Sequence, residues 1–255
     1  MTSWDDLHRR REPAAIAAYR ELASHRFLRA TLARLFVAGD TVLDIGCGRG
    51  EFVLELAGRG VNAVGLDSSP LAVETLRQDL RQSGLDPRRA LTGDGRSPPF
   101  SGSSLDGIIA LGLLEHFADH PAVLARWVEL LKPGGRILLQ VPNAERWAWF
   151  AFDVLARHLL LRRRWVAPRR TPRGLVSRIH GYEERWTASY LAGLCRQAGL
   201  EELESYSVYR ACAAELGAVA CRAWPWLERQ ATELPARRGL ILVYAGRKLT
   251  GPRSA

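Results

Sequence analysis

The sequence predicts an α/β fold, with a mainly parallel sheet of seven strands and helices on both of its faces. Short apolar runs rich in β-branched residues alternate along the chain with segments of helical periodicity, which favours βαβ units over an antiparallel meander. Of the 255 residues, 47% are apolar and 25% are charged, as in an ordinary globular chain. The chain is therefore long enough and apolar enough to bury one large core.

Seven segments have the composition of strands, being short, apolar and bounded by turn residues. They are residues 41–45, 61–66, 89–93, 105–111, 136–141, 203–209 and 240–246. Helical spacing of apolar residues predicts helices between them at 71–82, 122–131 and 188–198.

Local signals mark where these helices begin. Pro70 lies where the first turn of a helix tolerates a missing N–H. Ser69 and Thr187 are the expected caps of the first and third helices. Either Asp119 or His120 is expected to cap the second.

The segments that flank this core are predicted to cover it. Residues 13–36 have the pattern of one or two helices, which we expect to form a lid beside the site. Residues 144–186 combine an aromatic-rich helix with a stretch rich in Arg and Pro, and form an insertion. Residues 212–234 are a helical pattern interrupted by Pro225, and residues 248–255 are expected to fray.

Positive charge is concentrated in one segment. The chain has 36 Lys and Arg against 27 Asp and Glu, a net charge of +9. Residues 157–185 hold nine Arg and, as acids, only Glu183 and Glu184, so this segment alone contributes +7. A uniformly basic surface is typical of general nucleic-acid binding. One basic segment instead indicates a local acidic partner, a membrane-facing edge or a solvated loop.

Cysteine use and hydropathy indicate a cytoplasmic protein. The four cysteines form no CxxC pair, which disfavours a disulfide framework and a thiolate metal site. The first residues lack the basic-then-apolar order of a secretory signal. No apolar run approaches the ~20 residues that span a bilayer, so we expect no membrane span.

The strongest chemical signal is a glycine-rich turn after the first strand. Gly46, Gly48 and Gly50 follow an apolar strand and precede a helical pattern, where glycine lets the backbone approach a ligand. A dinucleotide fingerprint would place a third glycine at position 51, which is Glu51 here. The next strand ends at Asp67. A carboxylate there can accept both ribose hydroxyls of an adenosine-containing cofactor.

Further motifs follow in order: TGD at 92–94, EH at 115–116 and KPGG at 132–135. Together with VLDIGCGRG and GLD, they resemble the class I S-adenosylmethionine-dependent methyltransferases, in their small-molecule branch. The ordered match covers residues 42–143, and a weaker match covers 176–247. The resemblance implies a Rossmann-like sheet with an antiparallel last hairpin, and S-adenosylmethionine as the cofactor.

In this interpretation the whole chain is a single methyltransferase domain. Its expected parts are N-terminal helices (1–39), a cofactor-binding core (40–143), the insertion as a substrate cap (144–186), the C-terminal part of the sheet (187–247) and a tail (248–255).

The resemblance also implies which residues contact the cofactor. Asp44 would lie near its ammonium group, and Asp67 and Ser68 would hold the ribose. Asp94 and Gly95 would meet the edge of the adenine. The other predicted cofactor residues are Gly46, Cys47, Gly48 and Gly50 in the loop, and Leu111 beside the sulfonium.

These carboxylates have structural alternatives. Asp44 would instead cap the following turn, although a carboxylate within an apolar strand costs free energy unless it has a partner. Asp94 precedes a glycine, and this pair is also common in turns. We expect Asp106 to begin a strand and cap a turn rather than to touch a ligand.

The Glu115-His116 pair follows the fourth strand, at the edge where methyl acceptors bind in this family. His116 is the candidate catalytic residue, as a base that deprotonates an acceptor hydroxyl or amine. A hydrogen-bonded structural histidine is the alternative. In ubiquinone-pathway O-methyltransferases a further Glu, three residues before the pair, is implicated in metal binding. Gly112 occupies that position here, so we expect no metal site.

The function that these motifs imply is methyl transfer from S-adenosylmethionine to a small molecule. We expect O-methylation of a metabolite, a natural product or a cell-envelope sugar or lipid intermediate. The basic insertion favours an acidic or lipid-linked acceptor and peripheral membrane contact.

Two alternatives to this function stay open, an RNA or protein methyltransferase and a non-catalytic, cofactor-binding regulatory protein. The chain lacks an Asn-Pro-Pro-Tyr-like tetrad and an appended RNA-binding module, which disfavours a nucleic-acid partner. No residue pattern specifies the oligomeric state.

Overall fold

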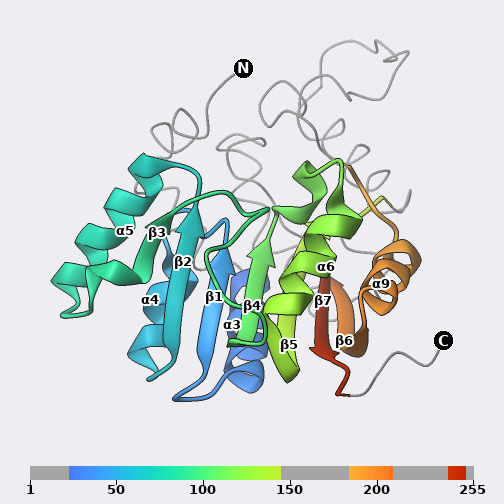
Figure 1. The fold of residues 1–255 in the computed structure, drawn as a ribbon, viewed down its shortest axis with the longest axis horizontal. Helices are drawn as coiled ribbons and strands as arrows, with labels where there is room; N and C mark the ends of the chain where they lie inside the picture. The colour runs from blue at the N-terminus through green and yellow to red at the C-terminus, as the bar shows by residue number, and fades with distance from the viewer. Residues whose placement is uncertain (1–22, 145–183, 209–240, 251–255) are drawn as a thin grey trace, which may run out of the picture.

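The computed structural model describes residues 23–144, 184–208 and 241–250, which form a seven-stranded sheet covered by helices (Figure 1). The order across the sheet is β3-β2-β1-β4-β5-β7-β6. The strands are β1 (Thr41–Ile45), β2 (Asn62–Asp67), β3 (Ala90–Thr92), β4 (Leu105–Leu111), β5 (Leu131–Pro142), β6 (Leu200–Val208) and β7 (Ile241–Lys248).

Strand pairing is parallel from β3 through β5, while β7 runs antiparallel to both β5 and β6. Asp44 of β1 lies opposite Gly65 of β2 in the register. The carboxyl ends of β1, β2 and β4 therefore share one edge of the sheet, at the top of Figure 1. The predicted Rossmann-like sheet with an antiparallel last hairpin is confirmed.

Described helices cover both faces of the sheet. Leu32, Leu56 and Leu76, from α3, α4 and α5, are buried against one face. Trp127 of α6 and Leu191 of α9 are buried against the other. The helix bounds are α3 (Ala23–Leu35), α4 (Glu51–Gly58), α5 (Pro70–Gln82), α6 (His120–Leu130) and α9 (Ala188–Gln197), with short 3-10 helices η1 (Pro87–Arg89) and η2 (Leu114–His116).

A predicted residue lies at the N-cap of each of the three helices, and two of these residues cap through their side chains. The Ser69 hydroxyl accepts a hydrogen bond from the Ala72 N–H at 3.2 Å, and the Thr187 hydroxyl accepts one from the Tyr190 N–H at 3.1 Å. Asp119 precedes α6, but its side chain makes no capping hydrogen bond. Asp119 thus holds the predicted cap position, while its carboxylate lies 3.8 Å from Arg96.

All seven predicted strands are present, and the largest shifts are at two starting points. β5 begins at Leu131 rather than at residue 136, because Leu131 pairs with Leu105 before an irregularity in the register. β6 begins at Leu200 rather than at residue 203, directly after Gly199, because Leu200 pairs with Lys248 of β7.

The described part of the N-terminal region is a core helix. Leu28, Leu32 and Leu35 of α3 recur at helical spacing and are buried beside the sheet. The rest of the predicted lid, residues 13–22, lies outside the described residues, as do 145–183 of the insertion and the predicted helix at 212–234. In the part of the chain that the structure describes, no helix is long and apolar enough to cross a membrane.

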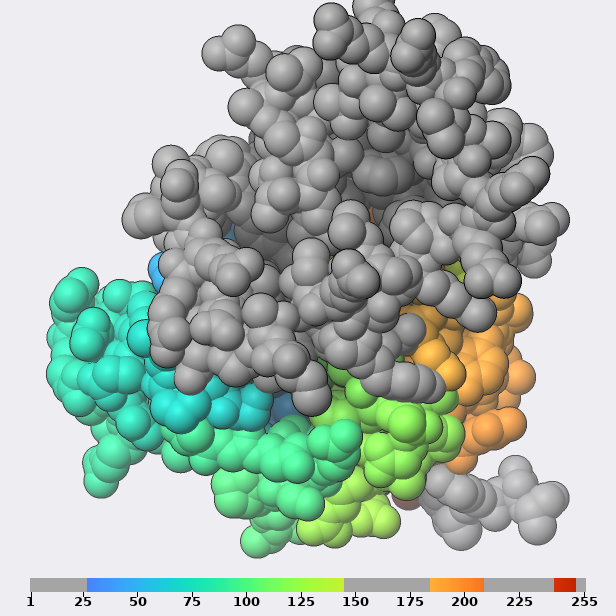
Figure 2. All heavy atoms as spheres, turned by 90° about the horizontal axis from the view of Figure 1, so that it is seen from above, coloured from blue at the N-terminus to red at the C-terminus, as the bar shows by residue number. Residues whose placement is uncertain are grey.

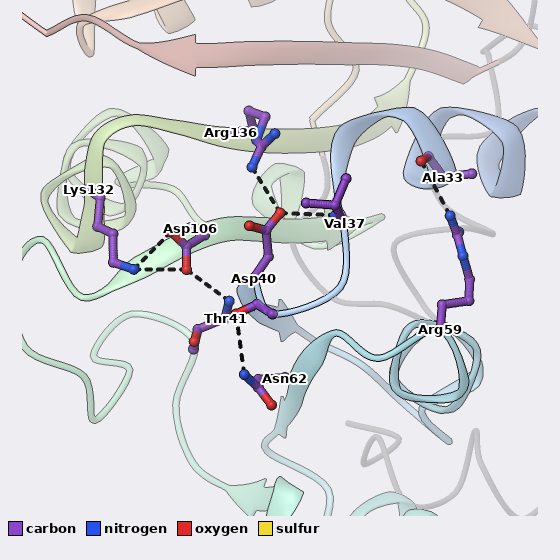
Figure 3. Close-up of polar contacts among 10 residues, drawn as sticks. Ala33, Val37, Asp40, Thr41, Arg59, Asn62, Asp106, Lys132 and Arg136 are labelled. Carbon is purple, nitrogen blue, oxygen red and sulfur yellow. Dashed lines mark hydrogen bonds and ion pairs between the residues drawn. The ribbon is translucent and has the colours of Figure 1, made fainter.

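Ion pairs join the amino ends of the central strands, at the edge opposite the glycine loop (Figure 3). The Asp106 carboxylate accepts hydrogen bonds from Lys132 Nζ at 2.8 and 2.9 Å and from the Thr41 N–H at 2.9 Å. Asp40 pairs with Arg136 at 2.9 Å. Burial alone would raise the pKa of Asp106, but these hydrogen bonds and the charges of Lys132 and Arg136 outweigh it and lower the pKa. Asp106 lies at the start of β4, as predicted, but it bonds to Lys132 and to the backbone of Thr41 instead of capping a turn.

Candidate functional site

The glycine loop, residues 46–50, joins β1 to α4 at the carboxyl edge of the sheet. Figure 2 views the molecule from above this edge, with α5 on one side and α6 and α9 on the other. Gly46 donates its N–H to the Leu66 carbonyl at 2.7 Å, and Gly50 donates to the Cys47 carbonyl at 2.9 Å. The loop therefore folds back on itself and remains attached to the end of β2.

Gly50 shows why this loop needs glycine. Its φ is +72°, a conformation that side chains disfavour, and it directly precedes α4. A Cβ at this position would lie only 2.3 Å from the Leu76 side chain of α5. A side chain at position 50 would therefore force the end of the Leu76 side chain to move.

Asp67 is the last residue of β2 and organises the loop beside it. One carboxylate oxygen accepts the Gly48 N–H at 2.8 Å, and the other accepts the Ser69 N–H at 2.8 Å. Ser68, which lies between Asp67 and Ser69 in the sequence, is exposed. The two backbone hydrogen bonds orient the Asp67 carboxylate at the carboxyl edge. Among the residues that the structure describes, no cationic side chain pairs with it.

Asp44 lies within β1 and is only 4% exposed. Burial, and then the negative charge of Asp67, raises the pKa of Asp44 from 3.8 to about 7. Burial also raises the pKa of the Cys47 thiol, with further contributions from both carboxylates. Within the described residues, no cationic side chain forms an ion pair with Asp44 or Asp67. This part of the site is therefore suited to a positively charged group.

Asp94 and Gly95 follow β3 on the same side of the sheet. The Asp94 side chain is 59% exposed and accepts the Arg96 N–H at 2.9 Å, as in an Asx turn. The Gly95 carbonyl accepts the Trp127 indole N–H at 2.7 Å. A Cβ on Gly95 would lie 3.0 Å from Ile45, so Gly95 is close to the end of β1. The turn that was the structural alternative for Asp94 is therefore present.

The segment after β4 carries the predicted catalytic residue. Leu111 ends β4, and Glu115 and His116 lie in η2, with Glu115 buried and His116 half-buried. Gly112 has a φ of +71°, so a Glu there would be strained. Across the described ranges, no group of three His, Cys, Asp or Glu side chains is placed to hold a metal ion.

A buried histidine was not predicted from the sequence, except as a helix cap. His120 Nε2 lies 2.7 Å from the Tyr190 hydroxyl, and Nδ1 lies 3.1 Å from the Phe117 carbonyl. Its ring centroid is 4.6 Å from that of the buried Trp186. His120 thus joins α6 to the segment that leads into α9. No local pattern indicated this contact, because Tyr190 lies 70 residues further along the chain.

A family described as a methyltransferase domain matches residues 16–205. The chain belongs to this family. A relative of this methyltransferase, a ubiquinone biosynthesis O-methyltransferase from Aromatoleum aromaticum, is 32% identical over 170 residues, which cover 66% of this chain and 67% of the relative.

Solved structures share the fold of this methyltransferase at lower identity. An S-adenosylmethionine-dependent methyltransferase from Mesorhizobium loti has a TM-score of 0.61 and 20% identity, over 90% of this chain and 100% of that chain. The cyclase SpnF has a TM-score of 0.58 and 20% identity, over 89% and 81% of the two chains. Because this fold is not restricted to one reaction, family membership rather than fold identifies the activity. The protein is an S-adenosylmethionine-dependent methyltransferase.

Proposed function

We propose that the carboxyl edge of β1, β2 and β4 holds S-adenosylmethionine, and that the protein methylates an oxygen atom of its acceptor. The observation that carries the cofactor assignment is the buried Asp44 carboxylate, whose pKa is raised to about 7 in the absence of a described cationic partner. A cation bound beside Asp44 would offset the cost of ionising it. The ammonium group of the cofactor has the required charge.

The remaining contacts follow from the placement of the loop and of the adjacent strand ends. Asp67 accepts the ribose hydroxyls, for which its carboxylate is already oriented by two backbone N–H groups. Asp94 and Gly95 lie at the adenine, and Leu111 lies near the sulfonium. The residues proposed to line the rest of the cofactor are Gly46, Cys47, Gly48, Gly50 and Ser68.

The bound cofactor supplies an electrophilic methyl group on a sulfonium. The protein then has to hold the acceptor oxygen in line with that methyl group and exclude water, and alignment alone accounts for much of the rate. His116 accepts the proton of the acceptor hydroxyl, from its position in η2 after β4. Glu115 and His116 are adjacent in this segment, and we assign no metal to them.

The relatives named for ubiquinone biosynthesis favour O-methylation over transfer to nitrogen or carbon. The Arg-rich part of the insertion, with +7 of the net +9 charge, favours an acidic or lipid-linked acceptor. We place the protein in the cytoplasm as a single domain, with contact at an anionic membrane surface where the acceptor is lipid-linked. RNA and protein substrates are the alternative acceptors.

The proposed function is tested by incubating the protein and a metabolite extract with methyl-labelled S-adenosylmethionine. We expect label in a small molecule, as a methyl ether or ester. Label found only in RNA or protein would contradict the proposal, and so would the absence of any transfer. With the acceptor identified, His116→Ala should lower kcat by about 10²-fold and leave the affinity for S-adenosylhomocysteine unchanged. A variant that keeps its kcat would assign His116 to structure.

A further inference from the structure

We infer that Arg29 is a positioning residue for cofactor binding: from α3 it holds the first turn of α4, the helix that directly follows the glycine loop. This inference rests on the proposed function, in which that loop lines the cofactor. Arg29 belongs to no motif in the sequence, and it becomes relevant only through the packing of α3 beside α4.

Arg29 makes two contacts with α4. Its Nη2 donates a hydrogen bond to Glu51 Oε1 at 3.0 Å, and its Nε lies 2.8 Å from Glu55 Oε2. The second contact lacks the alignment of a hydrogen bond, so Glu51 is the directional partner and Glu55 adds charge. Glu51 is the first residue of α4 and follows Gly50 directly. A shift of the Glu51 side chain would therefore also shift the backbone at the end of the loop.

The charge of Glu51 makes this contact relevant to the ligand. A Glu in the first turn is favoured by the helix dipole, but here it also brings a negative charge next to a loop that we propose binds the cofactor. The cofactor carries a carboxylate, which that charge would repel. The guanidinium of Arg29 offsets the charge of Glu51, whose side chain is only 18% exposed and is therefore weakly screened by water.

Helix α3, which carries Arg29, is held in place by its own packing and polar contacts. Leu28 and Leu32 are buried beside the sheet. Toward its other end, Arg34 donates to both oxygens of Glu204 at 3.0 Å, and the Thr31 hydroxyl lies 2.9 Å from the Tyr206 hydroxyl. These contacts reach β6 rather than the loop. Arg34 is therefore a matched control, being the same residue type on the same helix with its ion pair directed elsewhere.

The experiment measures S-adenosylhomocysteine binding by calorimetry, together with thermal unfolding, for wild type, Arg29→Gln and Arg34→Gln. We expect Arg29→Gln to weaken binding about three- to five-fold, the range for loss of a partly exposed ion pair. Arg34→Gln should bind as wild type does, although both variants unfold at a slightly lower temperature. Arg29→Lys should retain most of the affinity, because it keeps the positive charge beside Glu51.

A double variant tests whether Arg29 acts by offsetting the charge of Glu51. Removing the Glu51 charge as well, in Arg29→Gln with Glu51→Gln, should recover part of the lost affinity. The inference is overturned if Arg29→Gln binds as wild type does, if Arg34→Gln loses as much affinity, or if the double variant binds no better than the single one. Failure of the wild-type protein to bind S-adenosylhomocysteine would instead overturn the proposed function.

Discussion

The two edges of the sheet hold their carboxylates in opposite ways. At the amino edge, Asp106 meets Lys132 and the backbone of Thr41, and its pKa is lowered. At the carboxyl edge, Asp44 is buried near Asp67, and its pKa is raised to about 7. An aspartate thus stabilises the fold at the amino edge, whereas at the carboxyl edge a buried aspartate lowers the stability of the folded state. Such a cost is expected where binding requires an unpaired charge.

The largest effect should come from Asp44→Asn in the protein without cofactor. Because the pKa of Asp44 is raised, between pH 3.8 and about 7 the folded state keeps a proton that the unfolded state has already released. The contribution of Asp44 to the free energy of unfolding is therefore most favourable below pH 3.8, and it is lost as the pH rises through about 7. The variant should therefore match wild type near pH 4 and be more stable at pH 8, by up to about 4 kcal/mol from linkage.

Denaturant unfolding at several pH values measures this difference. An unchanged pH dependence in Asp44→Asn would show that another group titrates, and the contrast between the two edges would lose its main support. Binding of S-adenosylhomocysteine to the wild type should release protons near pH 7, because a bound ammonium favours the ionised carboxylate.

The next largest effect is expected for Asp67→Ala. Loss of charge-assisted hydrogen bonds to the ribose should weaken S-adenosylhomocysteine binding by ~2 kcal/mol, or about 30-fold. Asp94→Ala is the comparison, since that exposed carboxylate is bonded to its own turn and should matter less. Calorimetry on both variants decides. Equal losses would contradict the ranking, and unchanged affinity in folded Asp67→Ala would remove the ribose assignment.

A smaller effect, and on stability alone, is expected for Asp106→Asn. Losing the charge that pairs with Lys132 should lower the free energy of unfolding by about 1 kcal/mol, because the pair is partly exposed. In the wild type this contribution disappears as the pH falls below the ordinary range of an aspartate, the opposite direction to Asp44. Thermal unfolding measures the loss.

Asp86→Asn is the control for this variant, because the Asp86 carboxylate pairs with Arg88 at the surface. It should leave stability unchanged. A fall in S-adenosylhomocysteine affinity in Asp106→Asn, comparable with that of Asp67→Ala, would mean that the two edges do not act separately.

The smallest expected effect is that of magnesium on turnover, which should be none. The sequence resemblance implies that a metal site would need a Glu at position 112, where Gly112 has a positive φ that disfavours a side chain. Methyl transfer measured with EDTA, and again after addition of Mg²⁺, should proceed at the same rate. Loss of activity in EDTA that Mg²⁺ restores would contradict this prediction.

Local patterns predicted the strands, and the family resemblance implied that Asp44 and Asp67 would both contact the cofactor. The parallel register places both residues near the carboxyl ends of adjacent strands. The sequence did not separate the two roles of Asp94, because a turn and a ligand contact require the same residue. It also missed Arg29 and His120. Their partners are 22 and 70 residues away, and such contacts depend on which helix faces meet after folding.

Strand β7 has a consequence for how the chain is made. It is the last strand along the described part of the chain, yet it lies inside the sheet, between β5 and β6. While the ribosome is still translating this segment, both neighbours have an open edge that can pair with another chain. A premature stop before residue 241 would leave those edges permanently exposed. Nascent and truncated forms should therefore depend strongly on chaperones, even though every cofactor residue proposed above has already been synthesised.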